Sequence, residues 1–340
     1  MEKVSIRDVA SRAGVSVSTV SRALSRPEMV SESTRRKIQA IAEELDFSVS
    51  RTAGNLKSGK SRRIALLVGS NKIEWFTANI MEGLNSVILD QGYDLVFYPI
   101  SSVEDRRAFF EELPVRNNVD AVIISSFTAT AKEITRLHSA HVPLVGINSP
   151  STLNFSATVH TSDRTGMKLA IRHLSLLGHR KILYIYQTFH SSIKFSSYGR
   201  IQAFKDACAK KPGITGIVKS FENPHEAFDA LTTGILSEDD PPTAVCVHQD
   251  SQALPFLFRA QSIGLSIPDD LSIMGYDDSS FAQDVGLTTI RQDPYAMGRE
   301  AASKALQLIE SREPEIQHEE FPVELVVRRS TGEIRKYQLF

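Results

Sequence analysis

Arginine and hydroxyl side chains recur at helical spacing within residues 5–24, and together they could bind a nucleic acid. Arg22 can donate two parallel hydrogen bonds to a guanine, the commonest specific contact between a side chain and a base. Val17 and Ser18 are small, so they could meet base edges directly or through water. Hydroxyl groups that can donate to phosphate oxygens accompany them at Ser5, Ser16, Thr19, Ser21, Ser31 and Thr34.

Two short amphipathic helices joined at a glycine would position these side chains. Ser5 is placed to cap the first helix, with Asp8 at the capping-box position, and Gly14 stands where a residue with positive φ ends it. Ser16 would cap the second helix, whose apolar and polar residues fall on opposite faces at about 100° per residue. A third helix capped at Ser31 completes a small core. The pattern is typical of a helix-turn-helix, although an ordinary helical hairpin with a solvated serine face is the alternative.

The charge of the chain is unevenly distributed. Residues 1–63 hold 13 Lys or Arg against 7 Asp or Glu, a net charge of +6, whereas residues 64–340 have a net charge of −7. A basic head on an acidic body favours a polyanionic partner for the head alone.

Residues 51–63 are interpreted as a linker, following a head domain of residues 1–50. Leu56 is a large apolar residue in this hydrophilic segment. It could be a wedge inserted into the minor groove, in a segment that orders only on DNA, or a linker residue that packs loosely. Residues 54–61 match the phosphate-loop pattern literally, but the predicted strand follows the pattern instead of preceding it, which argues against an NTPase.

From residue 64 onward, short apolar runs alternate with helical patterns, which predicts an α/β fold with parallel sheets. The length favours two lobes over a single core. A ligand would bind in the cleft between them, beyond the carboxyl ends of the strands. The predicted helices cover residues 77–91, 103–116, 166–177, 198–210, 224–236, 251–261 and 295–310.

Other classes of protein are not favoured by the sequence. No apolar run approaches the roughly 20 residues of a membrane span, and there is no signal-peptide pattern, so we expect a cytoplasmic protein. The two cysteines and nine histidines show no metal-ligand spacing, and no nucleophile with a base and an orienting group is visible. We therefore expect no metal, no cofactor and no catalytic residue.

The chain resembles the LacI family of bacterial transcription regulators along nearly its full length. The segments that carry the resemblance are 8–22, 30–35, 177–182, 275–278 and 287–292. The likeness implies a homodimer in which each head reads half of a near-palindromic operator, with Leu56 as the minor-groove leucine. It also implies a periplasmic-binding-protein-like body, with one lobe of residues 64–161 and 291–322 and another of residues 162–290 and 323–340.

The resemblance further implies an effector cleft, formed by Trp75, Phe76, Ser125, Asn148, Tyr198, Gln249 and Asp277. Asp277 lies in a well-matched motif, and a charged acceptor suits the hydroxyl donors of a sugar. One departure is that family members often carry an arginine where this chain has Tyr198, and the nearest arginine is Arg200. The expected function is a repressor of carbohydrate-utilisation genes. The alternatives are a regulator controlled by a protein corepressor, a solute-binding protein and an α/β enzyme.

Overall fold

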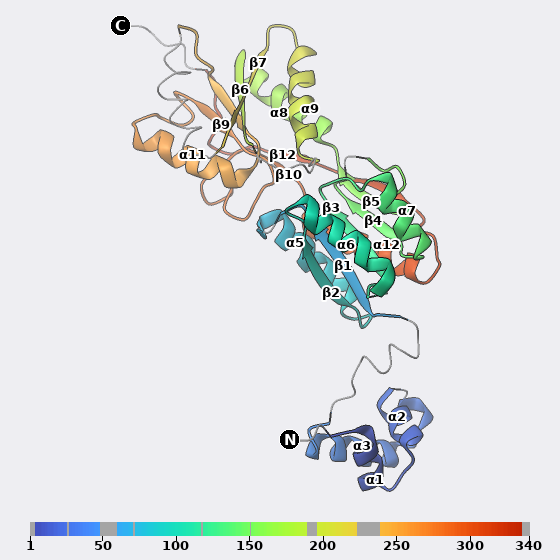
Figure 1. The fold of residues 1–340 in the computed structure, drawn as a ribbon. Helices are drawn as coiled ribbons and strands as arrows, with labels where there is room; N and C mark the ends of the chain where they lie inside the picture. Colours follow the sequence, from blue (N-terminus) through green and yellow to red (C-terminus); the bar gives the residue numbers. More distant parts are fainter. Residues whose placement is uncertain are drawn as a thin grey trace. The chain divides into compact units, whose positions relative to one another are not determined.

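The computed structural model describes the chain as two compact units, Met1–Ser61 and Arg62–Phe340, each with its own hydrophobic core (Figure 1). The residues described are 4–25, 27–47, 60–70, 72–116, 118–149, 151–188, 196–222 and 239–334. In this part of the chain, none of the helices combines the length and the apolar character needed to cross a bilayer.

The first unit, the head, is a three-helix domain. It consists of α1 (Ile6–Ala13), α2 (Val17–Ser25), the short 3-10 helix η1 (Pro27–Met29) and α3 (Glu32–Glu44). One apolar stripe from each helix forms the core, which contains Val9, Ala10, Ala13, Val20, Ala23, Ile38 and Ala42.

The predicted ends of these helices are confirmed. The Ser5 backbone N–H donates to Asp8 Oδ2 at 2.8 Å, which is half of the capping box. Gly14 ends α1 in the left-handed conformation, with φ 67°. Ser16 precedes α2 and accepts the Thr19 backbone N–H at 3.1 Å.

The second unit, the body, contains a six-stranded parallel sheet in the order β11-β5-β4-β3-β1-β2. Its strands are β1 (Arg63–Val68), β2 (Asp94–Pro99), β3 (Ala121–Ser125), β4 (Leu144–Ile147), β5 (Ala157–Thr161) and β11 (His318–Phe321). The central strands are apolar throughout because helices bury both faces. The helices α5 (Trp75–Ile88) and α12 (Pro294–Ile309) cover one face, and α6 (Val103–Arg116) and α7 (Ala131–Ser139) cover the other.

A four-stranded parallel sheet, in the order β7-β6-β8-β9, forms the other half of the body. Its strands are β6 (Lys181–Gln187), β7 (Thr215–Phe221), β8 (Ala244–Val247) and β9 (Ser272–Met274). One face packs against α8 (Asp163–Leu176) and α9 (Tyr198–Ala209), and the opposite face against α11 (Asp250–Ser262).

Between the two sheets lies an antiparallel pair, β10 (Thr289–Arg291) and β12 (Glu324–Val326). The chain passes from one sheet to the other after β5, after β10 and after β11. These crossings hold the carboxyl ends of both sets of strands close together, which is where ligands bind in open parallel sheets.

The predicted α/β class and the parallel sheets are confirmed, although several elements differ in detail. The helix α7 and the strands β11 and β12 were not predicted, and the helix predicted over residues 77–91 spans Trp75–Ile88. The apolar run at residues 287–290 predicts a strand that begins only at Thr289. The strand β11 is polar because it lies at the sheet edge with alternate side chains exposed. The predicted helix at residues 224–236 lies outside the described residues.

Candidate functional site

The polar face of α2 is exposed. Val20 and Ala23 are buried in the head core, whereas Ser18, Ser21 and Arg22 are exposed on the opposite side. Val17, at the start of the helix, leaves 41% of its surface exposed, although it is apolar. A small apolar group beside hydroxyl and guanidinium donors can contact both a thymine methyl and polar base edges.

The amino-terminal ends of α2 and α3 are built alike. Ser16 Oγ and Thr19 Oγ1 lie 2.8 Å apart at the start of α2, and Ser31 Oγ and Thr34 Oγ1 lie 2.9 Å apart at the start of α3. Ser5 is exposed at the start of α1. Helix amino termini with hydroxyl groups and backbone N–H donors are ready sites for phosphate. Leu56 lies outside the described residues.

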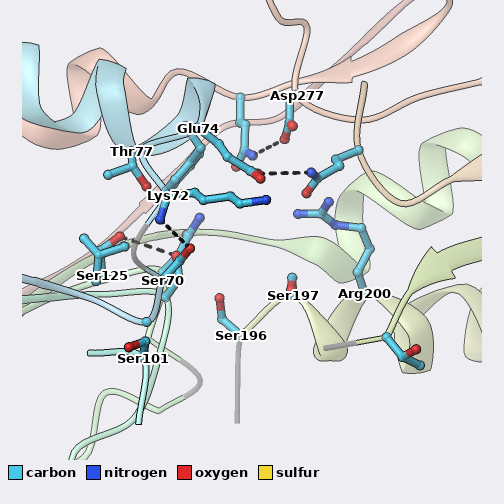
Figure 2. Close-up of a pocket in the computed structure, with 18 residues that line it drawn as sticks. Ser70, Lys72, Glu74, Thr77, Ser101, Ser125, Ser196, Ser197, Arg200 and Asp277 are labelled. Carbon is cyan, nitrogen blue, oxygen red and sulfur yellow. Dashed lines mark hydrogen bonds between the residues drawn. The ribbon is translucent and has the colours of Figure 1, made fainter. Parts of the chain in front are cut away.

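In the body, a cavity of about 440 Å³ lies between the two sheets at the carboxyl ends of their strands (Figure 2). Eight hydroxyl side chains line it: Ser70, Thr77, Ser101, Ser125, Ser126, Thr188, Ser196 and Ser197. The wall is completed by two cationic side chains, two anionic side chains, three amides, Phe76, Val68 and Gly69. Figure 2 shows Lys72, Glu74 and Arg200 reaching into the cavity. Two carboxyl groups stand against two cations in a wall dominated by hydroxyl groups, so a neutral ligand rich in hydroxyl groups fits it.

Asp277 is fixed at one side of this cavity. It follows β9 with a φ of 122°, and its Oδ1 accepts a 2.7 Å hydrogen bond from Gln292 Nε2. Burial is the main reason that its pKa is raised from 3.8 to about 8, although Arg200 opposes the rise. A ligand that donates hydroxyl hydrogen bonds would favour the ionised carboxylate.

Arg200 is held in place by three groups from the half of the body that contains the four-stranded sheet. Its Nε donates to Asp163 Oδ1 at 2.9 Å, its Nη1 donates to the carbonyl of His248 at 2.6 Å, and its guanidinium carbon lies 3.5 Å from the centre of the Tyr276 ring. Burial disfavours the charge, but Asp163 and other neighbours outweigh that effect, so the pKa of Arg200 is raised. The side chain is therefore a fixed cation in the cavity wall.

Residues of the six-stranded sheet form the other side of the cavity. Ser125 ends β3 and is 1% exposed. Asn148 follows β4 with a φ of 46°, and its Oδ1 accepts the Thr161 backbone N–H at 2.9 Å. This bond fixes the orientation of the amide and leaves Asn148 Nδ2 as its donor toward a ligand.

Five of the seven predicted effector residues line this cavity, namely Phe76, Ser125, Asn148, Gln249 and Asp277. Tyr198 instead lines an adjoining cavity of about 710 Å³, and Trp75 begins α5 and lines neither cavity. Sequence reasoning did not select Arg200, Lys72 or Glu74. The sequence did contain one indication of Arg200: family members often carry an arginine where this chain has Tyr198, and Arg200 is only two residues further along α9.

Burial of two carboxyl groups predicts that the free energy of unfolding falls as the pH rises from 3.8 to about 8. The pKa of Asp250 is raised to about 6 and that of Asp277 to about 8, in both cases mainly by desolvation. The folded protein keeps these protons while the unfolded chain releases them, so each stabilising contribution is lost as the pH passes the folded-state pKa. Urea unfolding at several pH values measures this. Asp277→Asn should flatten the upper part of the curve, and a curve parallel to that of the wild type would contradict the assignment.

Two family models match the chain. The model described as bacterial regulatory proteins, lacI family, matches residues 5–50, which contain the head helices. The model described as a periplasmic binding protein-like domain matches residues 171–331 in the body.

Curated relatives and solved structures extend the likeness to nearly the whole chain. The HTH-type transcriptional repressor PurR of Vibrio vulnificus (strain CMCP6) is 30% identical over 336 residues, which is 97% of this chain and 99% of the relative. The PurR of Salmonella arizonae is 30% identical over 98% of this chain and 99% of the relative. A crystal structure of the Lac repressor dimer bound to operator and the anti-inducer ONPF matches with a TM-score of 0.82 and 26% identity, covering 97% of this chain and 100% of that chain.

Proposed function

This chain belongs to the LacI family of bacterial regulatory proteins, and from that premise we propose that it represses transcription by binding a near-palindromic operator as a homodimer. The exposed polar face of α2 supports the proposal, since Arg22, Ser18 and Val17 could read base edges in the major groove. Hydroxyl groups at or near the starts of the three helices, Ser5, Ser16, Thr19, Ser31 and Thr34, would hold the phosphates, together with Ser21 on the exposed face of α2. Such a protein would act in the cytoplasm, beside its DNA.

A dimer contact would cover some of the apolar side chains that the body exposes. Phe258 in α11 and Ile263 directly after it leave 55% and 54% of their surfaces exposed. Apolar groups of this size at a subunit contact would be removed from water. The Lac repressor to which this chain is similar is a dimer on its operator. Light scattering of the purified protein gives the mass in solution.

The effector that the cavity favours is a neutral, polyhydroxylated molecule of the sugar class. The observation that carries this proposal is that one wall rich in hydroxyl groups holds both Asp277, an acceptor, and Arg200, a fixed donor. Sugar hydroxyls both donate and accept, so they can satisfy both groups at once. A purine base is the second candidate, because Phe76 brings an aromatic ring to the lining of the cavity.

Effector binding would control operator affinity through the arrangement of the two lobes. Gln249 Nε2 donates to Glu74 Oε2 at 3.3 Å, and this bond joins the four-stranded half of the body to the six-stranded half at the cavity. A ligand in the cavity would contact both halves and favour one arrangement over the other. Couplings of this kind typically amount to about 1–3 kcal/mol. The alternative is control by a protein corepressor.

The test combines ligand binding with operator binding. An operator is selected from random duplexes by the wild-type protein, and its affinity is measured by fluorescence anisotropy with and without each ligand. Neutral sugars, sugar phosphates, adenine and guanine are first screened by thermal shift. We expect a neutral sugar to raise the melting temperature and change operator affinity by about 5- to 150-fold. A response to purines alone, or a sugar that binds without changing operator affinity, would contradict the proposal.

A further inference from the structure

Asp250 is a buried carboxyl group at the start of α11, and it lines neither of the two cavities. It leaves 0% of its surface exposed, so a molecule in either cavity does not touch it. Burial is also the main reason that its pKa is raised to about 6. Because taking a carboxylate out of water costs free energy, what Asp250 holds in place needs an explanation.

The hydrogen bonds of Asp250 join three segments of the body. The backbone N–H of Ser279 donates to Asp250 Oδ2 at 2.8 Å, and the Ser279 hydroxyl donates to the same oxygen at 3.1 Å. Thr289, the first residue of β10, donates its hydroxyl to Asp250 Oδ1 at 2.8 Å. The backbone N–H of Asp250 donates to the carbonyl of Tyr276 at 2.8 Å. The carboxyl group therefore ties the start of α11 to the turn after β9 and to β10.

The turn after β9 has an unusual backbone, and the bonds of Asp250 lie on both sides of it. Two successive residues, Asp277 with a φ of 122° and Asp278 with a φ of 57°, have positive φ although neither is glycine. Such conformations persist only where the surrounding contacts hold them. Asp250 bonds to Tyr276 directly before this pair and to Ser279 directly after it. These contacts brace the strained turn from both ends.

Gly275, the residue before the braced turn, leaves room for the carboxyl group. A Cβ atom at this position would lie 2.1 Å from Asp250 Oδ1, which is far inside van der Waals contact. Only a glycine lets the carboxyl group approach the backbone this closely. The close approach is a second feature, independent of the hydrogen bonds, that fixes Asp250 against the turn.

The turn presents two carboxyl groups that serve different parts of the body. Asp277 lies at the side of the effector cavity, where Gln292 donates to it (Figure 2). Asp278 accepts hydrogen bonds from Arg291, at the end of β10, and from Arg328, which follows β12. A shift of the turn would therefore move the cavity wall and the contacts of the crossing segments together.

We propose that Asp250 is a positioning residue, which holds the turn of residues 276–279 so that Asp277 faces the effector cavity while Asp278 binds the segments that join the two halves of the body. The inference rests on the proposed function, because it takes Asp277 as the acceptor of the effector. Asp250 would act on the effector only through this turn.

The experiment follows the titration of the Asp277 carboxyl group in the full chain without any effector. Carbon-13 NMR of the aspartate side chains gives its midpoint, and Asp277→Asn assigns the signal. Burial raises the pKa of Asp277 to about 8, with the charges of Asp250 and Asp163 adding to the rise and Arg200 opposing it. Asp250→Ala releases the turn and removes the neighbouring charge, so the midpoint should fall by more than about one pH unit.

Asp250→Asn separates the two contributions and guards against a variant that does not fold. An asparagine keeps an oxygen acceptor for Ser279, and the Thr289 hydroxyl can accept from its amide. The turn should remain in place in this variant while the charge is lost. We therefore expect a smaller fall of the Asp277 midpoint than in Asp250→Ala.

Lys304→Met is the control for a general loss of stability. Lys304 is buried in the six-stranded half, where it binds Glu300 at 2.8 Å and Glu319 at 3.0 Å, and it lines neither cavity. This variant should destabilise the fold and leave the midpoint of Asp277 unchanged. A midpoint that stays near about 8 in both Asp250 variants, or that falls as far with Lys304→Met, would overturn the inference.

Calorimetry with D-glucose, D-galactose and the other neutral sugars of the thermal-shift screen tests the consequence for the effector. Asp250→Ala should weaken the sugar that the wild type binds by at least about tenfold, whereas Asp250→Asn should weaken it less than about threefold. Equal weakening by Lys304→Met would overturn the positioning role. If no neutral sugar binds the wild type, the proposed effector class fails, and the titration without effector still decides the role of Asp250.

Discussion

Replacing Arg22 by alanine will remove most of the protein's ability to distinguish its operator from random DNA. The side chain is exposed on the polar face of α2, opposite the buried Val20 and Ala23. A bidentate contact of arginine with guanine contributes about 1–3 kcal/mol of discrimination, so the ratio of specific to non-specific affinity should fall about 5- to 150-fold. Anisotropy titrations with the selected operator and a scrambled duplex, at several salt concentrations, measure this ratio.

Arg12→Ala is the control for the loss of charge. Arg12 lies on α1 and is paired with Glu44 of α3, so its replacement also removes one positive charge from the head without touching the face of α2. We expect this variant to keep the specificity ratio of the wild type and the response to effector. If Arg22→Ala binds operator and scrambled DNA with an unchanged ratio, α2 does not enter the major groove as proposed.

The helix ends of the head could be predicted because each depends on a few adjacent residues. Ser5 and Asp8 bond to each other across three positions, and Gly14 is needed where the backbone turns left-handed. These interactions are local, so they can be recognised without knowing the rest of the fold. The strand β11 could not be found in this way, because its sequence is polar and its pairing with β5 joins residues far apart in the chain.

The effector cavity was predicted only in part, and α9 shows why. At about 100° per residue, two positions two residues apart lie about 160° apart around the helix, so a one-position reading of the family pattern does not show which side chain reaches a site. Arg200 lines both cavities, whereas Tyr198 lines only the adjoining one. Lys72 and Glu74 precede α5 in an irregular segment, where no periodic pattern relates a residue to the side on which its side chain lies.

The second large effect is expected at Asp277, whose replacement by alanine should abolish the effector response and leave operator binding intact. The carboxylate is the buried acceptor of the effector cavity, and Gln292 holds its orientation at 2.7 Å. A hydrogen bond to a charged group contributes about 1.5–3 kcal/mol, so the affinity for the effector should fall at least about tenfold. Titration of the operator complex with effector measures the response, and the complex without effector gives the intact operator affinity.

Asp278→Asn is the matched control, because the next carboxylate along the chain lines neither cavity. Asp278 accepts hydrogen bonds from Arg328 Nη2 and Arg291 Nε, each at 2.7 Å. If the cavity of Asp277 binds the effector, Asp278→Asn will retain the effector affinity even where it lowers the stability of the fold, which urea unfolding reports separately. If both variants lose the effector response equally and both stay folded, the two carboxylates act on the segments that join the two halves of the body and not on the ligand.

The effector would bind the ionised form of Asp277. The effector affinity of the wild-type protein should therefore rise as the pH approaches about 8, and the Asp277→Asn variant should lack this rise.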